Sequence, residues 1–273
     1  MPIIAMTREM GSKGKDVAMG LAERMNMPIV HHNLVEHDIS ERLHVSESDV
    51  HRHLEGKTSL LERWRFPGNA LANMTACEVF ELAENGNVII RGWGSTQLLH
   101  SVDHVLCVRV FAPMEQRIVT LMDRLEIEDE SFARKEIITN DTAHGQLLKR
   151  MIHGDWQNPE LYDLVINTSR VSIEESVDLI EHTMQLPSFQ ETSSSQGLLR
   201  KLRIESQLRM LMLTDIKLTS DSASINFDVN PDTHDVILSG GVRKHATRKK
   251  MQDAVETVHG IGNIENNIAL VRE

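Results

Sequence analysis

TREMGSKGKDVA, residues 7–18, is the stretch that decides how the first part of this chain folds. A short apolar run, residues 2–6, precedes it, and Val17, Leu21 and Met25 follow at the four-residue spacing of one helix face. The stretch therefore predicts a strand, a glycine-containing turn and a helix, which is the opening of an α/β unit.

The glycines of this turn give it a chemical interpretation. Gly11 and Gly14 permit positive φ, so backbone N–H groups can converge on an anion at the positive end of the following helix dipole. Arg8, Lys13 and Lys15 add formal positive charge. The turn is thus a candidate phosphate loop; a tight strand-to-helix turn with solvated lysines stays open as the alternative.

The turn departs from the Walker A pattern G-x-x-x-x-G-K-[ST] at two positions. Asp16 stands where that pattern has the Ser or Thr that binds Mg²⁺, and Glu9 stands where it has its first Gly. Mg²⁺ binding through the usual loop hydroxyl is therefore not expected.

Apolar runs and helical patterns alternate through the rest of the first 186 residues. This order predicts a parallel sheet covered by helices on both faces, and so an α/β fold. Further strands are expected at residues 87–90, 104–111 and 163–167, and helices at residues 70–84, 114–126, 130–153 and 172–184.

Composition and charge limit the classes of protein. The 273 residues, 40% of them apolar, exclude a collagen-like, disulfide-scaffold or wholly disordered chain, and no apolar run approaches the ~20 residues of a membrane span. Residues 1–197 carry 18 Lys and Arg against 30 Asp and Glu, which disfavours nucleic acid as a partner. The N-terminus lacks a secretory signal, and with only two cysteines, Cys77 and Cys107, a reduced, cytoplasmic protein is expected.

A second domain is expected after a serine-rich linker, PSFQETSSSQG, at residues 187–197. Residues 198–273 carry 11 Lys and Arg against 10 Asp and Glu. They predict a small α+β domain with a first helix, strands around residues 225–229 and 235–242, a helix at 244–258 and a last strand at 264–271.

Residues 3–182 resemble the cytidylate-kinase-like family, a divergent, P-loop branch of the nucleoside monophosphate kinases. The resemblance rests on TREMGSKGKDVAMGLA, MPIVHHNLV, ENGNVIIRGWGS, HVLCVRVFAPMEQRI and DWQNPELYDLVINTSRVSIEESVDLI, in the family's order. It implies a kinase domain at residues 1–186, with ATP and Mg²⁺ as cofactors and CMP or dCMP as the best acceptor.

The resemblance also implies site residues. The donor phosphates would be held by Arg8, Gly11, Ser12, Lys13, Gly14 and Lys15, and the acceptor by His31 and Arg91. Residues 123–150 would form a lid whose cations neutralise the transferring phosphoryl group. Lys13, Lys15, Arg124 and Arg134 are the expected catalytic groups, with Arg117 and Lys135 as further candidates.

Three departures from the family bear on activity. Lys13 replaces a loop Gly, His31 replaces an Asp, and His144 replaces the Arg three residues after Asp141 in the lid. An imidazole, mostly neutral at pH 7, does not replace a guanidinium that clamps phosphate. Two hypotheses follow: a divergent kinase with weak or altered activity, and a catalytically silent nucleotide sensor. An assembly adaptor that uses neither pocket is a third.

Residues 200–273 resemble a BON domain, a small bacterial module, through ASINFDV, DVILSGGV and VHGIGNIENNIALV. The resemblance implies an accessory domain that binds phospholipid or another anionic ligand. RKHATRKK, residues 243–250, is the candidate basic face for anionic lipid, with a solvated helix face as the alternative. A homo-oligomer is also left open.

Six histidines fall between residues 31 and 53. Their spacing fits no zinc motif, so no metal site is predicted there. A polar, partly exposed helical segment is expected instead.

Overall fold

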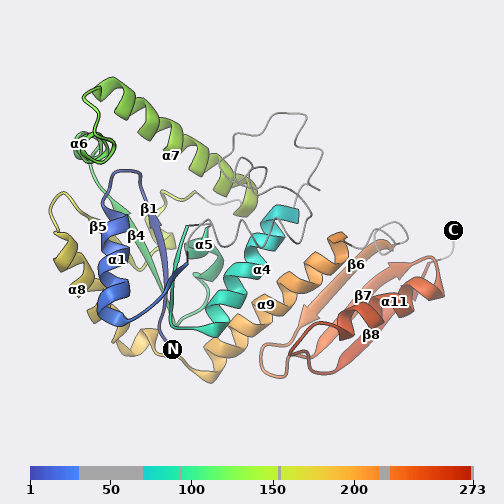
Figure 1. Ribbon diagram of the computed structural model, residues 1–273. Helices are drawn as coiled ribbons and strands as arrows, with labels where there is room; N and C mark the ends of the chain where they lie inside the picture. Colours follow the sequence, from blue (N-terminus) through green and yellow to red (C-terminus); the bar gives the residue numbers. More distant parts are fainter. Residues whose placement is uncertain (31–69, 93, 153–154, 215–221, 272–273) are drawn as a thin grey trace. The chain divides into compact units, whose positions relative to one another are not determined.

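The computed structural model describes residues 1–30, 70–92, 94–152, 155–214 and 222–271 (Figure 1). The chain divides into two compact units, residues 1–65 with 85–191, and residues 66–84 with 192–273. Each unit has its own sheet, five-stranded in the first and three-stranded in the second.

The first unit is built on a parallel sheet in the strand order β2-β3-β1-β4-β5. Its strands are β1 (Ile3–Arg8), β2 (Ile29–Val30), β3 (Val88–Arg91), β4 (Val105–Phe111) and β5 (Leu164–Asn167). The predicted parallel α/β sheet is confirmed, and β2, with two residues, is an addition. Because β1 is central, Ile3–Met6 are almost fully buried, as the unbroken apolar run requires.

Helices cover both faces of this sheet, as predicted. α1 (Gly14–Met25) and α8 (Ile173–Met184) pack on one face, where Leu21 and Ile180 join a core with Ile4. On the other face α5 (Ser95–Leu99) packs against β1 and β4, and the Cys107 thiol donates to the Thr96 carbonyl at 3.4 Å. α5 was not predicted.

Two further helices bring side chains to the carboxyl ends of the strands. α6 (Met114–Leu125) follows β4, and α7 (Glu130–Ile152) packs on α6 through Ile118, Leu121, Ala133 and Ile137 (Figure 1). Both helices lie close to their predicted bounds. The chain then passes a 3-10 turn, Pro159–Leu161, before β5.

The second unit is an α+β arrangement. Its helices and strands are α4 (Ala70–Asn85), α9 (Ser193–Thr214), β6 (Ser222–Val229), β7 (Val236–Val242), α11 (His245–Glu256) and β8 (Ile264–Leu270). Of α4, all but the last residue belongs to this unit. β7 is the middle strand, antiparallel to β6 and parallel to β8. One apolar core joins the sheet to α9 and α11 through Leu208, Leu238 and Met251.

The segment 187–197 is more ordered than a linker prediction suggests. Pro187–Phe189 form a 3-10 turn, and α9 already begins at Ser193. Thr192 Oγ1 accepts from the Ser195 N–H at 3.1 Å, while Ser195 Oγ accepts from the Thr192 N–H at 3.0 Å. Thr192 and Ser195 therefore cap a helix here. Amino-acid composition alone does not distinguish serines and threonines that cap a helix from those in a loop.

The first unit also differs from a continuous stretch of residues 1–186, because residues 66–84 belong to the second unit. Glu84 near the end of α4 accepts from Arg200 Nε at 2.7 Å and is ion-paired with Arg203. Both arginines lie on α9, so side chains distant in sequence tie α4 into the second unit. Within the described parts of the chain, no helix has the length and apolar character that a bilayer span requires.

Candidate phosphate-binding site

The loop between β1 and α1 has the backbone conformation that its glycines allow. Gly11 has φ 77° and Lys13 has φ 58°, both in the left-handed region. A Cβ on Gly11 would lie 2.4 Å from the carbonyl oxygen of Arg117, so only glycine fits against α6 at this point. The close approach fixes the loop against the helix that follows β4.

The loop leaves several backbone N–H groups available. Glu9 N–H donates to the Val110 carbonyl at 3.1 Å, and Ser12 N–H donates to the Glu9 carbonyl at 3.2 Å. Within the described residues, the N–H groups of Gly11, Lys13, Gly14 and Lys15 have no acceptor. Together with the N-terminus of α1, they form an arrangement suited to an anion.

Ser12 supports the loop through its hydroxyl. The side chain is 1% exposed and donates to the carbonyls of Glu9, at 2.8 Å, and Val110, at 3.2 Å. The Thr168 hydroxyl donates to the Ser12 carbonyl at 2.7 Å. The Ser12 hydroxyl is thus engaged in holding the loop rather than directed at a ligand.

An open pocket of about 340 Å³ lies over the loop. The sequence-predicted residues Arg8, Gly11, Ser12, Lys13, Gly14, Lys15 and Arg124 all line it. Four further lining residues were not predicted to do so: Glu9, Asp16, Thr120 and Asp123. Thr120 and Asp123 lie one helical turn apart, on the same face of α6. That this face lines the pocket becomes clear only when α6 is placed beside the loop.

Arg8 and Arg124 line this pocket, and Arg91 is near enough for the three like charges to act on one another as a cluster. Burial, reinforced by the charges of Arg91 and Arg124, lowers the pKa of Arg8 to about 10, against attraction from Asp16. Burial and Arg124 also lower the pKa of Arg91. Among the described residues, none of the three guanidiniums has a carboxylate hydrogen-bond partner. Such repulsion is relieved when an anion binds between the cations.

Of the predicted lid cations, the structure brings Arg124 to the pocket but not Arg134 or Lys135. Arg134 lies one turn after the start of α7, where its guanidinium pairs with Glu130 at 3.3 Å, and Lys135 beside it is exposed. Neither lines the pocket. The expected catalytic position of Arg134 therefore differs from its observed one, because the helical turn directs it to its own i–4 carboxylate.

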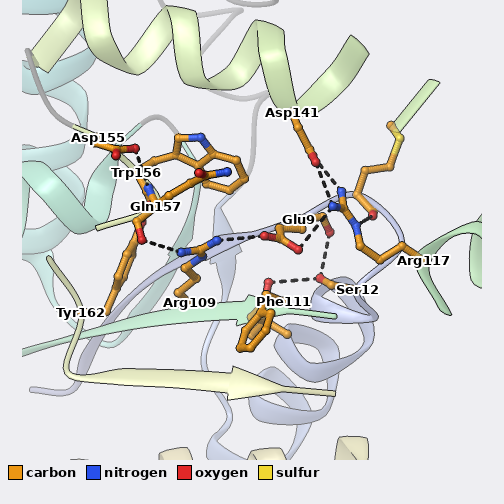
Figure 2. A network of polar contacts seen from close by, with 12 residues as sticks. Glu9, Ser12, Arg109, Phe111, Arg117, Asp141, Asp155, Trp156, Gln157 and Tyr162 are labelled. Carbon is orange, nitrogen blue, oxygen red and sulfur yellow. Dashed lines mark hydrogen bonds and ion pairs between the residues drawn. The ribbon is translucent and has the colours of Figure 1, made fainter. Parts of the chain in front are cut away.

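Arg117 is not a lid cation either, but part of a buried network (Figure 2). Its Nε donates to the Met10 carbonyl at 2.7 Å, and its two terminal nitrogens donate to the Asp141 carboxylate, each at 2.8 Å. Glu9 lies between two arginines, with Arg109 at 2.8 Å and Arg117 at 3.4 Å. Figure 2 shows Asp141 reaching from α7 to the loop through Arg117.

The second arginine of the network is held by aromatic rings. The Arg109 guanidinium lies 5.2 Å from the Trp156 ring centre and donates to the Gln157 carbonyl at 2.9 Å. The Tyr162 hydroxyl donates to the Trp156 carbonyl at 2.5 Å. The DWQNPELYD segment thus holds Arg109 in place beside Glu9 and does not line the pocket.

His144 stands where the resemblance expects a lid arginine, and it is neutral at pH 7. Its ring packs edge-on against Trp156 with centroids 4.8 Å apart, and Nε2 has no hydrogen-bond partner among the described residues. Burial lowers the pKa of His144 to about 4, with Asp141 opposing and Arg8 reinforcing the shift. This position supplies no charge to a phosphate.

The predicted acceptor residue His31, and the histidines up to residue 53, lie outside the described residues. No group of three His, Cys, Asp or Glu residues that could hold a metal occurs in the described ranges. Mg²⁺ in phosphate sites needs only one or two carboxylates beside the substrate oxygens, and Asp16 and Asp123 offer such oxygens in the pocket. The donor set therefore fits a Mg²⁺ that arrives with a nucleotide.

Comparison with known proteins assigns the part of the chain that contains this site to a family. Residues 3–170 match the cytidylate kinase-like family. This chain belongs to that family. The match includes the glycine loop, the arginine cluster and the Arg117–Asp141 pair, and membership implies ATP and usually Mg²⁺ as cofactors of a nucleotide kinase-like protein.

Two curated cytidylate kinases are similar to the chain. The protein from Methanococcus aeolicus is 26% identical over 106 residues, 38% of this chain and 59% of the relative. The protein from Pyrobaculum islandicum is 19% identical over 178 residues, 65% of this chain and 89% of the relative. The chain thus spans less than two thirds of the first relative's length and most of the second's.

A solved structure supports the fold. An uncharacterized protein from Eubacterium ventriosum superposes with a TM-score of 0.51 at 19% identity, covering 67% of this chain and 98% of that one. The parallel sheet flanked by helices, with a glycine loop after its central strand, is the fold of P-loop kinases.

Proposed function

We propose that this protein transfers the γ-phosphoryl group of ATP to a nucleoside monophosphate, with CMP or dCMP as the best acceptor. The observation that carries the proposal is the cluster of Arg8, Arg91 and Arg124, which has no carboxylate hydrogen-bond partner among the described residues and adjoins the glycine loop. Two phosphate-bearing substrates need cations of this kind on both sides of the transferring group.

The donor phosphates bind the loop in this proposal. The free N–H groups of Gly11, Lys13, Gly14 and Lys15 donate to phosphate oxygens, and the exposed Lys13 and Lys15 side chains add positive charge. The Ser12 hydroxyl keeps the loop in shape. The acidic surroundings make these few local cations decisive for affinity.

The three arginines of the cluster bind different phosphate groups. Arg91, the last residue of β3, binds the phosphate of the acceptor, while Arg8 and Arg124 neutralise the charge on the transferring group. Phosphoryl transfer depends mainly on positioning and electrostatics, so these residues act without covalent chemistry. Bound Mg²⁺ supplies further charge neutralisation, with Asp16 or Asp123 as the residues that would hold it.

The assay for this function measures ADP formation from ATP and Mg²⁺ with a panel of nucleoside monophosphates. Turnover that depends on the acceptor, with CMP or dCMP fastest, is expected. The Lys13→Ala/Lys15→Ala double variant should lose most of it. No turnover above that double variant with any acceptor would contradict the kinase proposal.

A catalytically silent nucleotide sensor is the second candidate, and His144 favours it. The neutral ring against Trp156 and the outward Arg134 leave the lid with less positive charge than phosphoryl transfer usually uses. Nucleotide binding without turnover supports this candidate. A melting temperature unmoved by any nucleotide would favour an adaptor instead, since a ligand at 100 times its Kd adds about 2.7 kcal/mol.

For the second unit we propose a BON-like accessory module at residues 198–273, after a connecting segment at 187–197. Its α9-β6-β7-α11-β8 order and mixed sheet support this assignment. Arg243, Lys249 and Lys250 are exposed at the start of α11 and could meet anionic phospholipid, whereas Arg248 donates to the Asn266 carbonyl at 2.7 Å. Flotation with anionic vesicles at low salt tests this, and absence of co-flotation would end the lipid proposal.

We further propose a reduced, bacterial cytoplasmic setting. Cys77 and Cys107 are both buried, and neither forms a disulfide with another described residue, which suits a protein that does not depend on disulfides. Mass spectrometry with thiol alkylation under denaturing, non-reducing conditions should find both thiols modifiable. A homo-oligomer is testable by light scattering of the full chain.

A further inference from the structure

The network in Figure 2 gives Arg117 contacts on both of its sides that concern the phosphate loop. Its side-chain Nε donates to the Met10 carbonyl at 2.7 Å, and its own backbone carbonyl lies against Gly11. Gly11 carries the first of the loop's free N–H groups, and Met10 immediately precedes it. The position of Arg117 therefore determines where those N–H groups point.

The Arg117 guanidinium depends on Asp141 for its own position. Arg117 is 4% exposed, and a buried charge requires a hydrogen-bonded partner. The two parallel 2.8 Å hydrogen bonds to Asp141 are a fork-to-fork pair, the geometry that fixes an arginine best. The other acidic neighbour, Glu9, is 3.4 Å away and already accepts from Arg109 at 2.8 Å.

Asp141 in turn lies on α7, in the segment where a lid is expected. One guanidinium therefore joins three parts of the first unit: the loop at Met10, the helix α6 that carries Arg117, and the helix α7 that carries Asp141. Removing the Asp141 charge leaves Glu9 as the nearest remaining carboxylate, so the guanidinium should turn toward Glu9 and release the Met10 carbonyl.

We propose that Arg117 and Asp141 are positioning residues, which set the shape of the phosphate loop from α7 without touching the nucleotide. Asp141 acts through Arg117, and Arg117 acts through Met10 and Gly11. This inference rests on the proposed nucleotide binding at the loop, but its effect on loop shape is independent of any ligand.

The test compares Asp141→Asn with Glu130→Gln in the full chain. Both variants remove one α7 carboxylate from an arginine pair, but Glu130 pairs with the exposed Arg134 and has no contact with the loop. In protein labelled with ¹⁵N-glycine and without ligand, Asp141→Asn should move the amide resonances of Gly11 and Gly14, and Glu130→Gln should leave them in place. Thermal melting checks that each variant is folded.

Titration with ATP and Mg²⁺ gives the functional readout. Asp141→Asn should raise the Kd for ATP roughly tenfold to a hundredfold, the range expected for displaced groups, and change the Kd for CMP much less. Arg117→Lys keeps the positive charge but cannot form the paired hydrogen bonds to Asp141, so it should have the same effects as Asp141→Asn. If Asp141→Asn does not fold, Arg117→Lys tests the positioning role instead.

The outcomes separate the two claims. Wild-type protein that binds no ATP contradicts the proposed function, whereas the glycine resonances still test the positioning role. Unmoved Gly11 and Gly14 resonances in folded Asp141→Asn, or wild-type ATP affinity in that variant, would overturn the positioning role even if the protein is a kinase.

Discussion

Gly11 and Arg117 are in such close contact that a Cβ on Gly11 would lie 2.4 Å from the Arg117 carbonyl oxygen. The phosphate loop therefore takes its shape from α6 as well as from its own sequence. Gly11 also has φ 77°, which side chains rarely adopt.

Gly11→Ala should therefore lower the free energy of unfolding by about 2 kcal/mol or more and weaken ATP binding. Denaturant unfolding and ATP titration measure both effects. Gly20→Ala is the matched control, because it lies in α1 and would meet only a Val177 methyl, at 3.0 Å. Equal losses in both variants would contradict the close-contact account.

Arg124→Gln should separate stability from binding. Burial lowers the pKa of both Arg8 and Arg91, and the charge of Arg124 adds to both shifts, so removal of Arg124 relieves part of the repulsion. We expect the free energy of unfolding without ligand to stay constant or rise by up to about 1 kcal/mol, while the nucleotide-induced shift in Tm falls. Arg24→Gln, which removes an exposed cation at the far end of α1, should leave the shift intact.

His144 makes stability depend on pH in the acid range. Its pKa is lowered to about 4 from an ordinary 6.5, so the unfolded chain takes up the proton first as the pH falls. Stability is lost between pH 6.5 and 4, by about 3 kcal/mol at most, and is complete above that window. His144→Asn should flatten this part of the profile relative to wild type. The exposed His182→Asn should not, and a parallel change in both would refute the assignment.

The Glu84 pairs offer a test of the second unit. Arg203 is 5% exposed, is ion-paired with Glu84 and donates to the His259 carbonyl at 2.9 Å, whereas Arg200 holds the same carboxylate from an exposed position. Arg203→Ala should cost about 3 kcal/mol and Arg200→Ala under about 1 kcal/mol in urea unfolding. Similar losses of unfolding free energy in the two variants would mean that burial does not determine how much each ion pair contributes to stability.

The sequence was informative where one local pattern determines one structure. The apolar run before TREMGSKGKDVA predicts a strand buried on both faces, and β1 is the central strand. The loop residues that the sequence predicts as phosphate ligands all line the pocket, because the glycine loop and the helix start are neighbours in sequence. Most of the expected strands and helices lie near their expected bounds, whereas α5 was not expected and α9 begins inside the predicted linker.

What could not be predicted depends on contacts between distant residues. Arg117 and Arg134 are both arginines on amphipathic helices, and only the packing of α6 and α7 decides that one is buried against Asp141 and the other pairs with Glu130. The serine run at 193–195 has the composition of a linker but begins α9, because serines that cap a helix and serines in a loop look alike in composition. The membership of α4 in the second unit depends on Arg200 and Arg203, 116 residues or more away.

The most direct test of phosphate binding at the loop is a crystal structure of the full chain with CMP, Mg²⁺ and a non-hydrolysable ATP analogue. We predict that the terminal phosphates of the analogue accept from the N–H groups of Gly11, Lys13 and Gly14, and that the CMP phosphate lies against Arg91. A loop without phosphate, with the nucleotides bound elsewhere or not at all, would contradict the central claim.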